Sequence, residues 1–291
     1  MLGDEEVKKI GLVIPTYNAG QEFDEVLNLI NNQDEVLYRK LIIDSESKDF
    51  TLTVAIDKGF EVKRIKSSEF GHGKTRTLAA ETLNDCYYII FMTQDVFLQK
   101  DALRNLIKFI ESNSNLGVVY GRQEVDMNKS NIFEKKAREF NYPKKSLIKT
   151  YKDKEQLGIK TVFSSNAFSI YNSLKLEEIG SFPNDLQFSE DMYVAAKLIK
   201  ANYSVGYCAE AKVYHSHNYS ILDEYKRYQS IGKFHKENPW LQQEFGRNEI
   251  EGVKSVFAEW KYLINNRKIN LLPSSLMRFG MKYLGYKSGG C

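Results

Sequence analysis

A short apolar run that stops at a carboxylate carries the first chemical signal in this sequence. The five residues Tyr88–Met92 are followed at once by Thr93, Gln94 and Asp95. A run this short, rich in β-branched and aromatic residues, predicts a strand buried on both faces, as in a parallel sheet covered by helices. Ligands of such sheets lie beyond the carboxyl ends of the strands, where an aspartate can hold Mg²⁺ or Mn²⁺ through its oxygen atoms. The alternative is a polar loop in which Asp95 or Asp101 caps the next helix.

Further polar groups follow other predicted strands and are therefore expected at the same edge of the sheet. His215 and His217 alternate at strand spacing, so their side chains point the same way and become metal-ligand candidates beside Asp95. Asp44 is a candidate binding residue, although it could simply cap the turn after its strand. The complete set is Pro15, Thr16, Tyr17 and Asn18 after the strand at 10–14, Asp44 after the strand at 41–43, and His215 and His217 after the strand at 212–214.

Two adjacent acids, Glu190 and Asp191, open a predicted helix. A carboxylate at such a position can accept a proton from a hydroxyl group and so act as a general base. Acids are also favoured in the first turn of a helix by its dipole, without any catalytic role. Both acids are therefore catalytic candidates with a purely structural alternative.

A glycine-rich basic segment, residues 70–76, precedes another predicted helix. Gly71 and Gly73 would allow the backbone to approach a ligand closely. Lys74 and Arg76 supply cations that could meet a diphosphate. The alternative is a glycine-hinged turn whose basic residues face solvent.

Strands and helices alternate through the first 120 residues, which predicts βαβ units, a mostly parallel sheet and an α/β fold. Beyond residue 120 the pattern changes to polar, basic and aromatic segments with more widely spaced elements. The predicted strands of the first part lie at 10–14, 41–43, 61–65 and 88–92, and its predicted helices around 23–30, 51–58, up to 83, and 102–110. The second part has a predicted helix around 132–140, a strand at 162–171 interrupted by polar residues 164–166, a helix opening at 189–191, short strands at 203–207 and 212–214, and helices from about 221.

The composition is typical of a globular protein and argues against nucleic-acid binding and against a membrane span. The chain has 291 residues, 42% of them hydrophobic and 27% charged, which is ordinary for a globular protein. The net charge of +3 argues against nucleic acid as a partner. No apolar run approaches the roughly 20 residues of a membrane span, and the acidic N-terminus has no signal-peptide pattern. Three widely spaced cysteines favour a reducing compartment, so we expect a cytosolic protein.

The C-terminal tail has an unusual charge pattern. No acidic residue follows Glu259, whereas six Lys or Arg residues do. Apolar residues sit among them, which is typical of an interfacial helix on an anionic membrane surface. On this interpretation Arg278, Lys282 and Lys287 contact the membrane. The alternative is a helix that docks on the body of the protein or forms a homo-oligomer.

The order and spacing of these groups over residues 8 to 240 resemble glycosyltransferase family 2, whose members have the GT-A fold. The resemblance implies an inverting enzyme that moves a sugar from a nucleotide diphosphate with the help of Mg²⁺ or Mn²⁺. It also implies a transferase domain at 1–220, with a donor half at about 1–125 and an acceptor half at about 126–220. A helical extension with the basic tail would occupy 221–291.

The resemblance implies a role for each candidate residue. Asp191 is expected to be the general base, with Glu190 as its neighbour in the catalytic pair. Asp95, assisted by His215 or His217, is expected to hold the metal. The expected nucleotide-sugar-binding residues are Pro15, Thr16, Tyr17, Asn18, Asp44, His72, Gly73, Lys74, Arg76, Thr93, Gln94 and Asp95.

The Thr93-Gln94-Asp95 motif, together with residues 70–76, resembles bacterial rhamnosyltransferases. This subgroup implies transfer of rhamnose from dTDP-L-rhamnose to a lipid-linked cell-surface polysaccharide, by an enzyme on the inner face of the plasma membrane. Two alternatives stay open. One is the same fold with another donor, such as a UDP-hexose. The other is a non-catalytic scaffold that binds nucleotide sugars or membranes.

Overall fold

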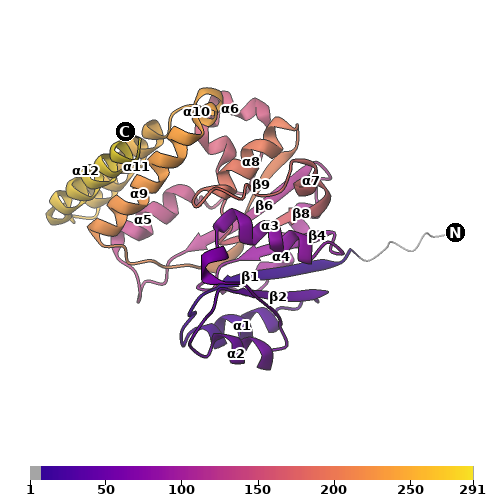
Figure 1. Cartoon of the computed structure of the whole chain (residues 1–291). Coiled ribbons are helices and arrows are strands. Elements are labelled where there is room, and N and C mark those ends of the chain that lie inside the picture. The colour runs from indigo at the N-terminus through magenta and orange to yellow at the C-terminus, as the bar shows by residue number, and fades with distance from the viewer. Residues whose placement is uncertain (1–7, 291) are drawn as a thin grey trace.

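Short apolar runs with polar turns between them form one nine-stranded sheet with helices packed on both faces (Figure 1). The computed structural model describes residues 8–290. The strands are β1 Ile10–Thr16, β2 Arg39–Asp44, β3 Glu61–Arg64, β4 Tyr88–Met92, β5 Phe97–Leu98, β6 Leu116–Glu124, β7 Leu147–Lys149, β8 Phe168–Asn172 and β9 Ser204–Tyr214. The helices up to the last strand are α1 Phe23–Asn31, α2 Thr51–Asp57, α3 His72–Thr82, α4 Ala102–Glu111, α5 Ile132–Asn141, α6 Lys154–Leu157, α7 Ser173–Glu178 and α8 Glu190–Lys200. The C-terminal helices are α9 Ile221–Glu237, α10 Pro239–Phe245, α11 Asn248–Asn265 and α12 Leu272–Gly289, and short 3₁₀ turns lie at Ser67–Glu69, Tyr151–Asp153, Gly158–Val162 and Ile269–Leu271.

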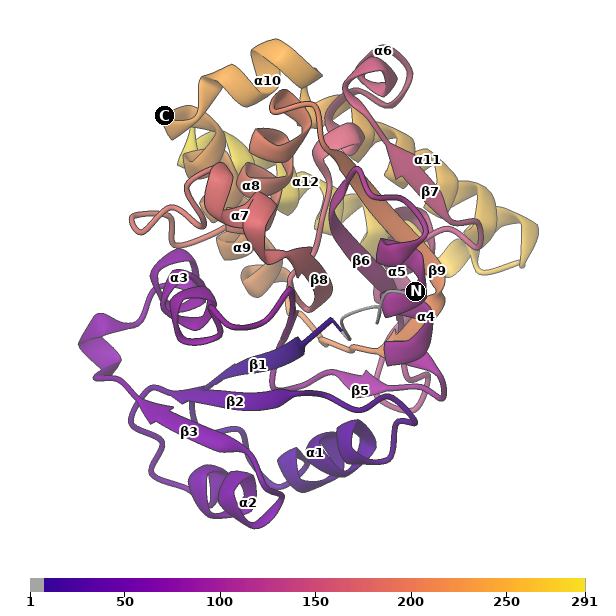
Figure 2. The same cartoon turned by 90° about the vertical axis from the view of Figure 1, so that its right-hand side faces the viewer.

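The strands follow the order β3-β2-β1-β4-β8-β6-β9-β5, with β7 also paired to β9. The first four strands in this order are parallel, as the βαβ pattern predicts. The other half of the sheet is mixed, because β8 runs antiparallel between β4 and β6 while β6 and β9 are parallel. Figure 2 shows β1, β2 and β3 with α1 and α2 below them, and the C-terminal helices on the far side of the molecule.

Every residue of β4 is buried, which confirms the prediction of a strand covered on both faces. Ile89 and Phe91 point into one apolar core, and Ile90 and Met92 point into the other. This alternation follows from the period of two along a strand. Burial of both faces fixes the register of β4, and therefore the position of the Thr93-Gln94-Asp95 turn.

Three predicted strands have different bounds in the structure. The two short strands predicted at 203–207 and 212–214 are one continuous strand, β9, which keeps its pairing with β6 through a register shift. The strand predicted at 162–171 begins only at Phe168, because Gly158–Val162 forms a 3₁₀ turn. Residues 164–166 are thereby left out of the sheet, and Asn166 turns toward the start of α8.

The C-terminal helices pack on the body through α10, which contacts the 3₁₀ turn Gly158–Val162, and through α11, which contacts α5. Ser220 caps α9 in a reciprocal arrangement with Asp223. The helix α12 approaches α9 so closely that a Cβ atom on Gly285 would lie 2.3 Å from the carbonyl oxygen of Tyr225. A Cβ on Gly289 would lie 1.9 Å from the carbonyl oxygen of Gln229. Glycine is therefore required where the two backbones meet.

Candidate active site

Asp95, His215 and His217 converge at the carboxyl ends of β4 and β9. The distance from Asp95 Oδ2 is 3.4 Å to His215 Nε2 and 3.8 Å to His217 Nε2. The short strand β5, which begins two residues after Asp95, pairs with the end of β9 immediately before His215. This pairing brings together residues more than a hundred positions apart in the sequence. The prediction that Asp95 and the two histidines lie side by side is confirmed.

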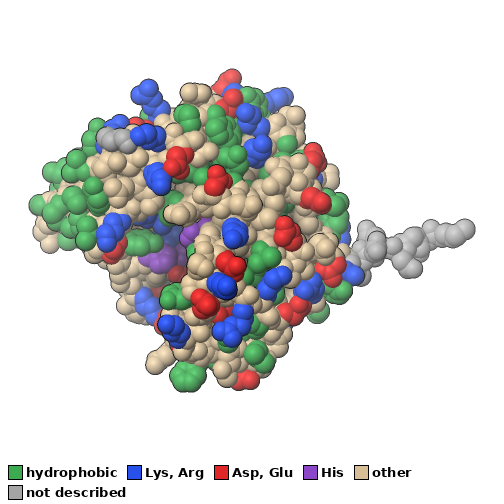
Figure 3. All heavy atoms as spheres, viewed as in Figure 1, with side chains coloured by type: hydrophobic (Ala, Val, Ile, Leu, Met, Phe, Trp, Pro, Cys, Tyr) green, Lys and Arg blue, Asp and Glu red, His purple; other side chains and the backbone are tan. Residues whose placement is uncertain are grey.

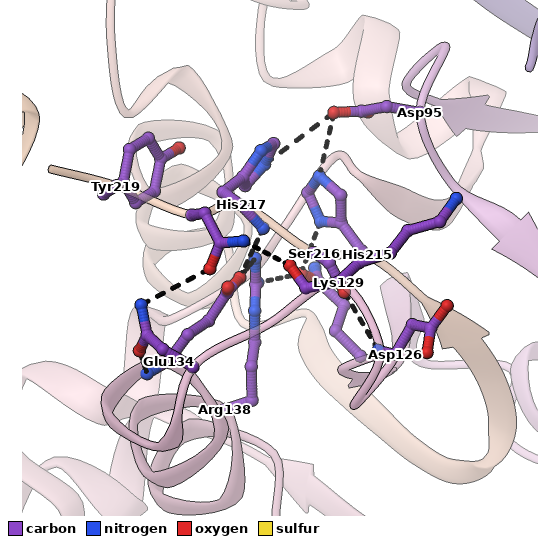
Figure 4. Close-up of polar contacts among 12 residues, drawn as sticks. Asp95, Asp126, Lys129, Glu134, Arg138, His215, Ser216, His217 and Tyr219 are labelled. Carbon is purple, nitrogen blue, oxygen red and sulfur yellow. Dashed lines mark hydrogen bonds and ion pairs between the residues drawn. The ribbon is translucent and has the colours of Figure 1, made fainter.

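Polar residues from β6 and α5 orient the two histidines (Figure 4). His215 Nδ1 lies 2.8 Å from Gln123 Oε1, an oxygen that can only accept a hydrogen bond. This bond engages Nδ1 and leaves Nε2 as the ring nitrogen that faces Asp95. Arg138 donates to the same Gln123 oxygen. The backbone N–H of His217 donates to Glu134 Oε1 at 2.5 Å.

The electrostatics of this cluster suit a divalent cation. Burial lowers the pKa of His215, and burial together with His215 lowers the pKa of His217 to about 4, so both rings are neutral near pH 7. Burial alone would raise the pKa of Asp95, but the contacts with His215 and His217 shift that pKa well below its usual value. Asp95 Oδ1 is buried and has no hydrogen-bond partner within residues 8–290. The three ligand atoms lie within 4.8 Å of one another. A carboxylate with one unpartnered oxygen, next to two neutral imidazoles, fits a metal ion.

Glu190 and Asp191 lie in different environments although they are adjacent. Glu190 Oε1 lies 3.0 Å from an Arg76 nitrogen, and both side chains are buried. Asn166 donates to the same Glu190 oxygen at 3.0 Å, and its own oxygen accepts the hydroxyl of Tyr171 at 2.7 Å. Glu190 is therefore a charge-paired residue within a hydrogen-bonded network.

Among residues 8–290, Asp191 has no ion-pair partner. Its carboxylate accepts the backbone N–H of Met192 at 2.8 Å and, more weakly, that of Asn166 at 3.4 Å. Burial, and then the neighbouring charge of Glu190, raise the pKa of Asp191 to about 7. A carboxylate with a pKa near the working pH is well matched to proton transfer.

The glycine-rich segment does not have the geometry that the sequence suggested. Arg76 pairs with Glu190 and does not face an open diphosphate site. A Cβ on Gly73 would lie 1.8 Å from the carbonyl oxygen of Pro183, so Gly73 permits contact between two backbone segments and not with a ligand. His72 and Lys74 are exposed at the start of α3, where contact with a ligand stays a prediction.

The turns after β1 and β2 are joined by hydrogen bonds. The Tyr17 backbone bonds in both directions to the Gln94 side chain, at 2.9 and 3.2 Å, which ties the turn after β1 to the turn after β4. The N–H of Asn18 donates to Ser47 Oγ at 2.8 Å. Pro15 lies within β1, and Thr93 donates its N–H to a carbonyl of the loop before β8.

Asp44 organises these turns from a fully buried position. Its carboxylate accepts the hydroxyl of Thr16 at 3.0 Å and both the N–H and the hydroxyl of Ser47, at 2.9 and 2.5 Å. With 0% of its surface exposed, Asp44 does not present a free oxygen to a nucleotide base in this conformation. These bonds shape the surrounding loops, and a contact of Asp44 with the nucleotide sugar stays a prediction.

The basic residues assigned to the membrane face the protein instead. Arg278 and Lys282 lie 3.0 and 3.5 Å from Glu224 of α9. Lys287 lies 3.3 Å from Glu249 of α11. Arg278 and Lys282 are largely covered by these contacts, so they do not form a free basic surface, whereas Lys287 is half exposed and its contact with a membrane stays a prediction.

Arg278 lies next to the segment that carries the histidines. It donates to the carbonyl oxygen of Tyr219 at 3.2 Å, two residues after His217. Its guanidinium lies 5.0 Å from the ring centre of Phe133, the residue before Glu134. The sequence did not indicate this role, nor those of Gln123, Glu134 and Arg138. For Asn166 a signal was present, since it belongs to the polar interruption of an apolar stretch.

The fold and the paired acidic sites define a class of protein, the GT-A glycosyltransferases. The mannosyltransferase PcManGT from Pyrobaculum calidifontis, solved in complex with GDP-Man and Mn²⁺, matches with a TM-score of 0.66 at 13% identity. The match covers 97% of this chain and 86% of that one. S. aureus TarS 1–349 matches with a TM-score of 0.55 at 16% identity, over 97% and 90% of the two chains. These likenesses show the fold.

The sequence comparisons identify the family. Residues 12–180 match the model of glycosyl transferase family 2, and the chain belongs to this family. It is 43% identical to the O-antigen chain rhamnosyltransferase RfbN of Salmonella typhimurium, over 97% of this chain and 89% of RfbN. It is 39% identical to the O-antigen chain rhamnosyltransferase WbaN of Salmonella anatum, over 96% and 88%. The predicted family, fold class and glycosyltransferase activity are confirmed. Across residues 8–290, no helix has the length and apolar character needed to cross a membrane.

Proposed function

We propose that this glycosyltransferase moves L-rhamnose from dTDP-L-rhamnose to a lipid-linked intermediate of a cell-surface polysaccharide. The similarity to RfbN and WbaN along almost the whole chain supports the rhamnosyl group and an O-antigen-like acceptor. The observation that carries the proposal is the pair of acidic sites, with Asp95 beside two histidines and Asp191 with a raised pKa. We place the reaction at the cytoplasmic face of the plasma membrane, where a lipid-linked acceptor would be held.

The metal centre in this proposal consists of Asp95, His215 and His217. Imidazole ligands favour transition metals, so the set suits Mn²⁺ better than Mg²⁺. When bound, the cation would stabilise the negative charge that grows on the leaving diphosphate. Asp95 supplies the charged ligand, and Gln123 holds the His215 ring in the tautomer that can ligate.

Asp191 acts as the general base. The acceptor hydroxyl attacks the anomeric carbon of rhamnose while the bond from that carbon to the diphosphate oxygen breaks. The hydroxyl proton passes to the Asp191 carboxylate, and dTDP leaves. Attack from the face opposite the leaving group inverts the configuration at the anomeric carbon. The ion pair between Glu190 and Arg76 holds the start of α8 in place and leaves Asp191 to accept the proton.

A panel of donors tests this function. Release of nucleoside diphosphate is measured with dTDP-rhamnose, UDP-hexoses and GDP-mannose, with and without EDTA, on a lipid-linked acceptor extract. We expect turnover with dTDP-rhamnose that EDTA abolishes and Mn²⁺ restores. Preference for a UDP-hexose would contradict the donor assignment, and activity unaffected by EDTA would contradict the metal. Absence of turnover with every donor would support the non-catalytic alternative.

A further inference from the structure

The outer side of the helical hairpin α11–α12 carries a row of exposed apolar residues. On α11 they are three, four and seven positions apart, and on α12 they form two adjacent pairs that are seven positions apart, so each set lies on one side of its helix. In Figure 3 hydrophobic side chains gather at the left, where these two helices project from the body. The residues, each between 44% and 64% exposed, are Ile250, Val253, Phe257 and Ile264 on α11, Ile269 in the turn, and Leu276, Met277, Tyr283 and Leu284 on α12. We call this surface the hairpin face. Soluble proteins rarely leave a patch of this extent without a partner.

The turn that joins α11 and α12, together with the residues next to it (260–275), carries only positive charges. We call this part of the hairpin its closed end. Lys261, Arg267 and Lys268 are exposed there, next to Ile264 and Ile269. The sequence has no Asp or Glu after Glu259, so this end of the hairpin itself offers them no carboxylate. They differ in this respect from the three cations further along α12, which pair with Glu224 and Glu249.

We propose that the hairpin face rests on an anionic lipid surface. Ile264 and Ile269 enter the interface, and Lys261, Arg267 and Lys268 lie among the phosphate headgroups. Apolar side chains flanked by cations are the combination that an anionic bilayer binds. A second copy of this chain is a poorer partner, because a symmetric contact would bring the same cations together. The inference rests on the proposed function, since it explains how a lipid-linked acceptor would be met.

The position of the hairpin suits this role. Figure 3 shows histidine side chains in a hollow beneath the projecting hydrophobic side chains, and Figure 1 places α11 and α12 above that opening. A surface that receives the hairpin would therefore lie beside the opening of the site. The acceptor could reach Asp191 and the metal ligands without leaving the membrane. The proposed membrane contact therefore consists of residues at the turn between the two helices, and not of Arg278, Lys282 and Lys287 as the sequence suggested.

Flotation of the full-length protein with lipid vesicles tests the proposal directly. Vesicles of phosphatidylcholine alone are compared with vesicles that also contain phosphatidylglycerol, at low and high salt and without donor. The K261E/R267E/K268E variant should bind the anionic vesicles about 100-fold more weakly, because each cation contributes roughly fivefold to the affinity. The matched control is K100E/K108E/K197E, which makes the same charge change at exposed positions on other elements. It should float like the wild type.

The apolar contribution is tested by I264Q/I269Q, with V36Q/I56Q as the control at exposed apolar positions elsewhere. The first pair should lower binding by about tenfold or more, and the control should not. Neither pair should alter turnover on a short soluble acceptor analogue, which separates this proposal from the proposed function. Two results would overturn the inference: a wild type that fails to float with anionic vesicles at low salt, or one that forms a dimer which I264Q/I269Q dissociates.

Discussion

Asp95 and Asp191, the aspartates of the two acidic sites, have pKa values that are shifted in opposite directions. Asp95, in contact with His215 and His217, has a pKa shifted well below its usual value. Asp191, buried beside the charged Glu190, has a pKa raised to about 7. The first environment suits a permanent charge that holds a cation, and the second suits a group that gains and loses a proton. The comparison illustrates that the surroundings, and not the residue type, set the protonation behaviour of a carboxylate.

Replacement of Asp191 should have the largest effect and should separate the two sites most clearly. Asp191→Asn keeps the shape of the side chain but removes the proton acceptor, so kcat should fall by ~10²–10⁴. Donor affinity should stay nearly unchanged, because the proposed donor-binding residues lie on other turns. Steady-state kinetics and donor titration measure the two quantities. If donor affinity collapses while kcat survives, Asp191 binds the donor and another group is the base.

Replacement of Asp95 tests the proposed metal site. Asp95→Asn should lower turnover by ~10²–10³, because the diphosphate loses an electrostatic anchor. Added Mn²⁺ should not restore the activity. Circular dichroism serves as the control for folding, since Asp95 lies in a half-exposed turn. A variant with nearly normal turnover would contradict the metal role.

The residues that orient the histidines should have a smaller effect. Gln123→Leu removes the acceptor that fixes the His215 tautomer, and loss of such a partner typically costs 10–100-fold in metal affinity. Gln123→Glu keeps an acceptor at this position and should retain most of the affinity. Titration of Mn²⁺ into each variant gives the comparison. Equal Mn²⁺ affinity in the wild type and Gln123→Leu would show that this hydrogen bond does not contribute to metal binding.

The smallest expected effect is a change in stability with pH. Asp191 holds its proton up to a pKa of about 7 in the folded protein, against a usual value of 3.8. The unfolded chain releases that proton at lower pH, so this residue makes the folded state progressively less stable as pH rises from about 4 to 7. Asp191→Asn should therefore raise the melting temperature at pH 8, with a difference that vanishes below pH 4. A difference that is independent of pH would contradict the raised pKa.

Local patterns were enough to predict the first half of the fold. The run Tyr88–Met92 is short, apolar and followed by a polar turn, and it forms a strand buried on both faces as predicted. The order of the later strands could not be predicted, because the antiparallel insertion of β8 depends on pairing between distant segments. The single strand β9 was divided in the prediction because its bulge contains a polar residue, Glu210.

The candidate site was predicted in part for a similar reason. Strand ends identify residues at the correct edge of the sheet, which is why Asp95 and the two histidines were found. Their supporting residues could not be found this way, since Gln123 lies inside a strand and Arg138 on a helix that carries no motif. The partner of Arg76 was also hidden, because only the fold brings it to Glu190. The tail was misassigned because periodicity does not show which side of a helix docks.

The affinity for Mn²⁺ in the two aspartate variants is the most direct test of the proposal that Asp95 holds the metal and Asp191 accepts the proton. Mn²⁺ is titrated, in the presence of dTDP, into the wild type, Asp95→Asn and Asp191→Asn. We expect the wild type and Asp191→Asn to bind Mn²⁺ equally well, and Asp95→Asn to lose binding. Loss of Mn²⁺ binding in Asp191→Asn, or its retention in Asp95→Asn, would contradict the assignment of separate roles to these two carboxylates.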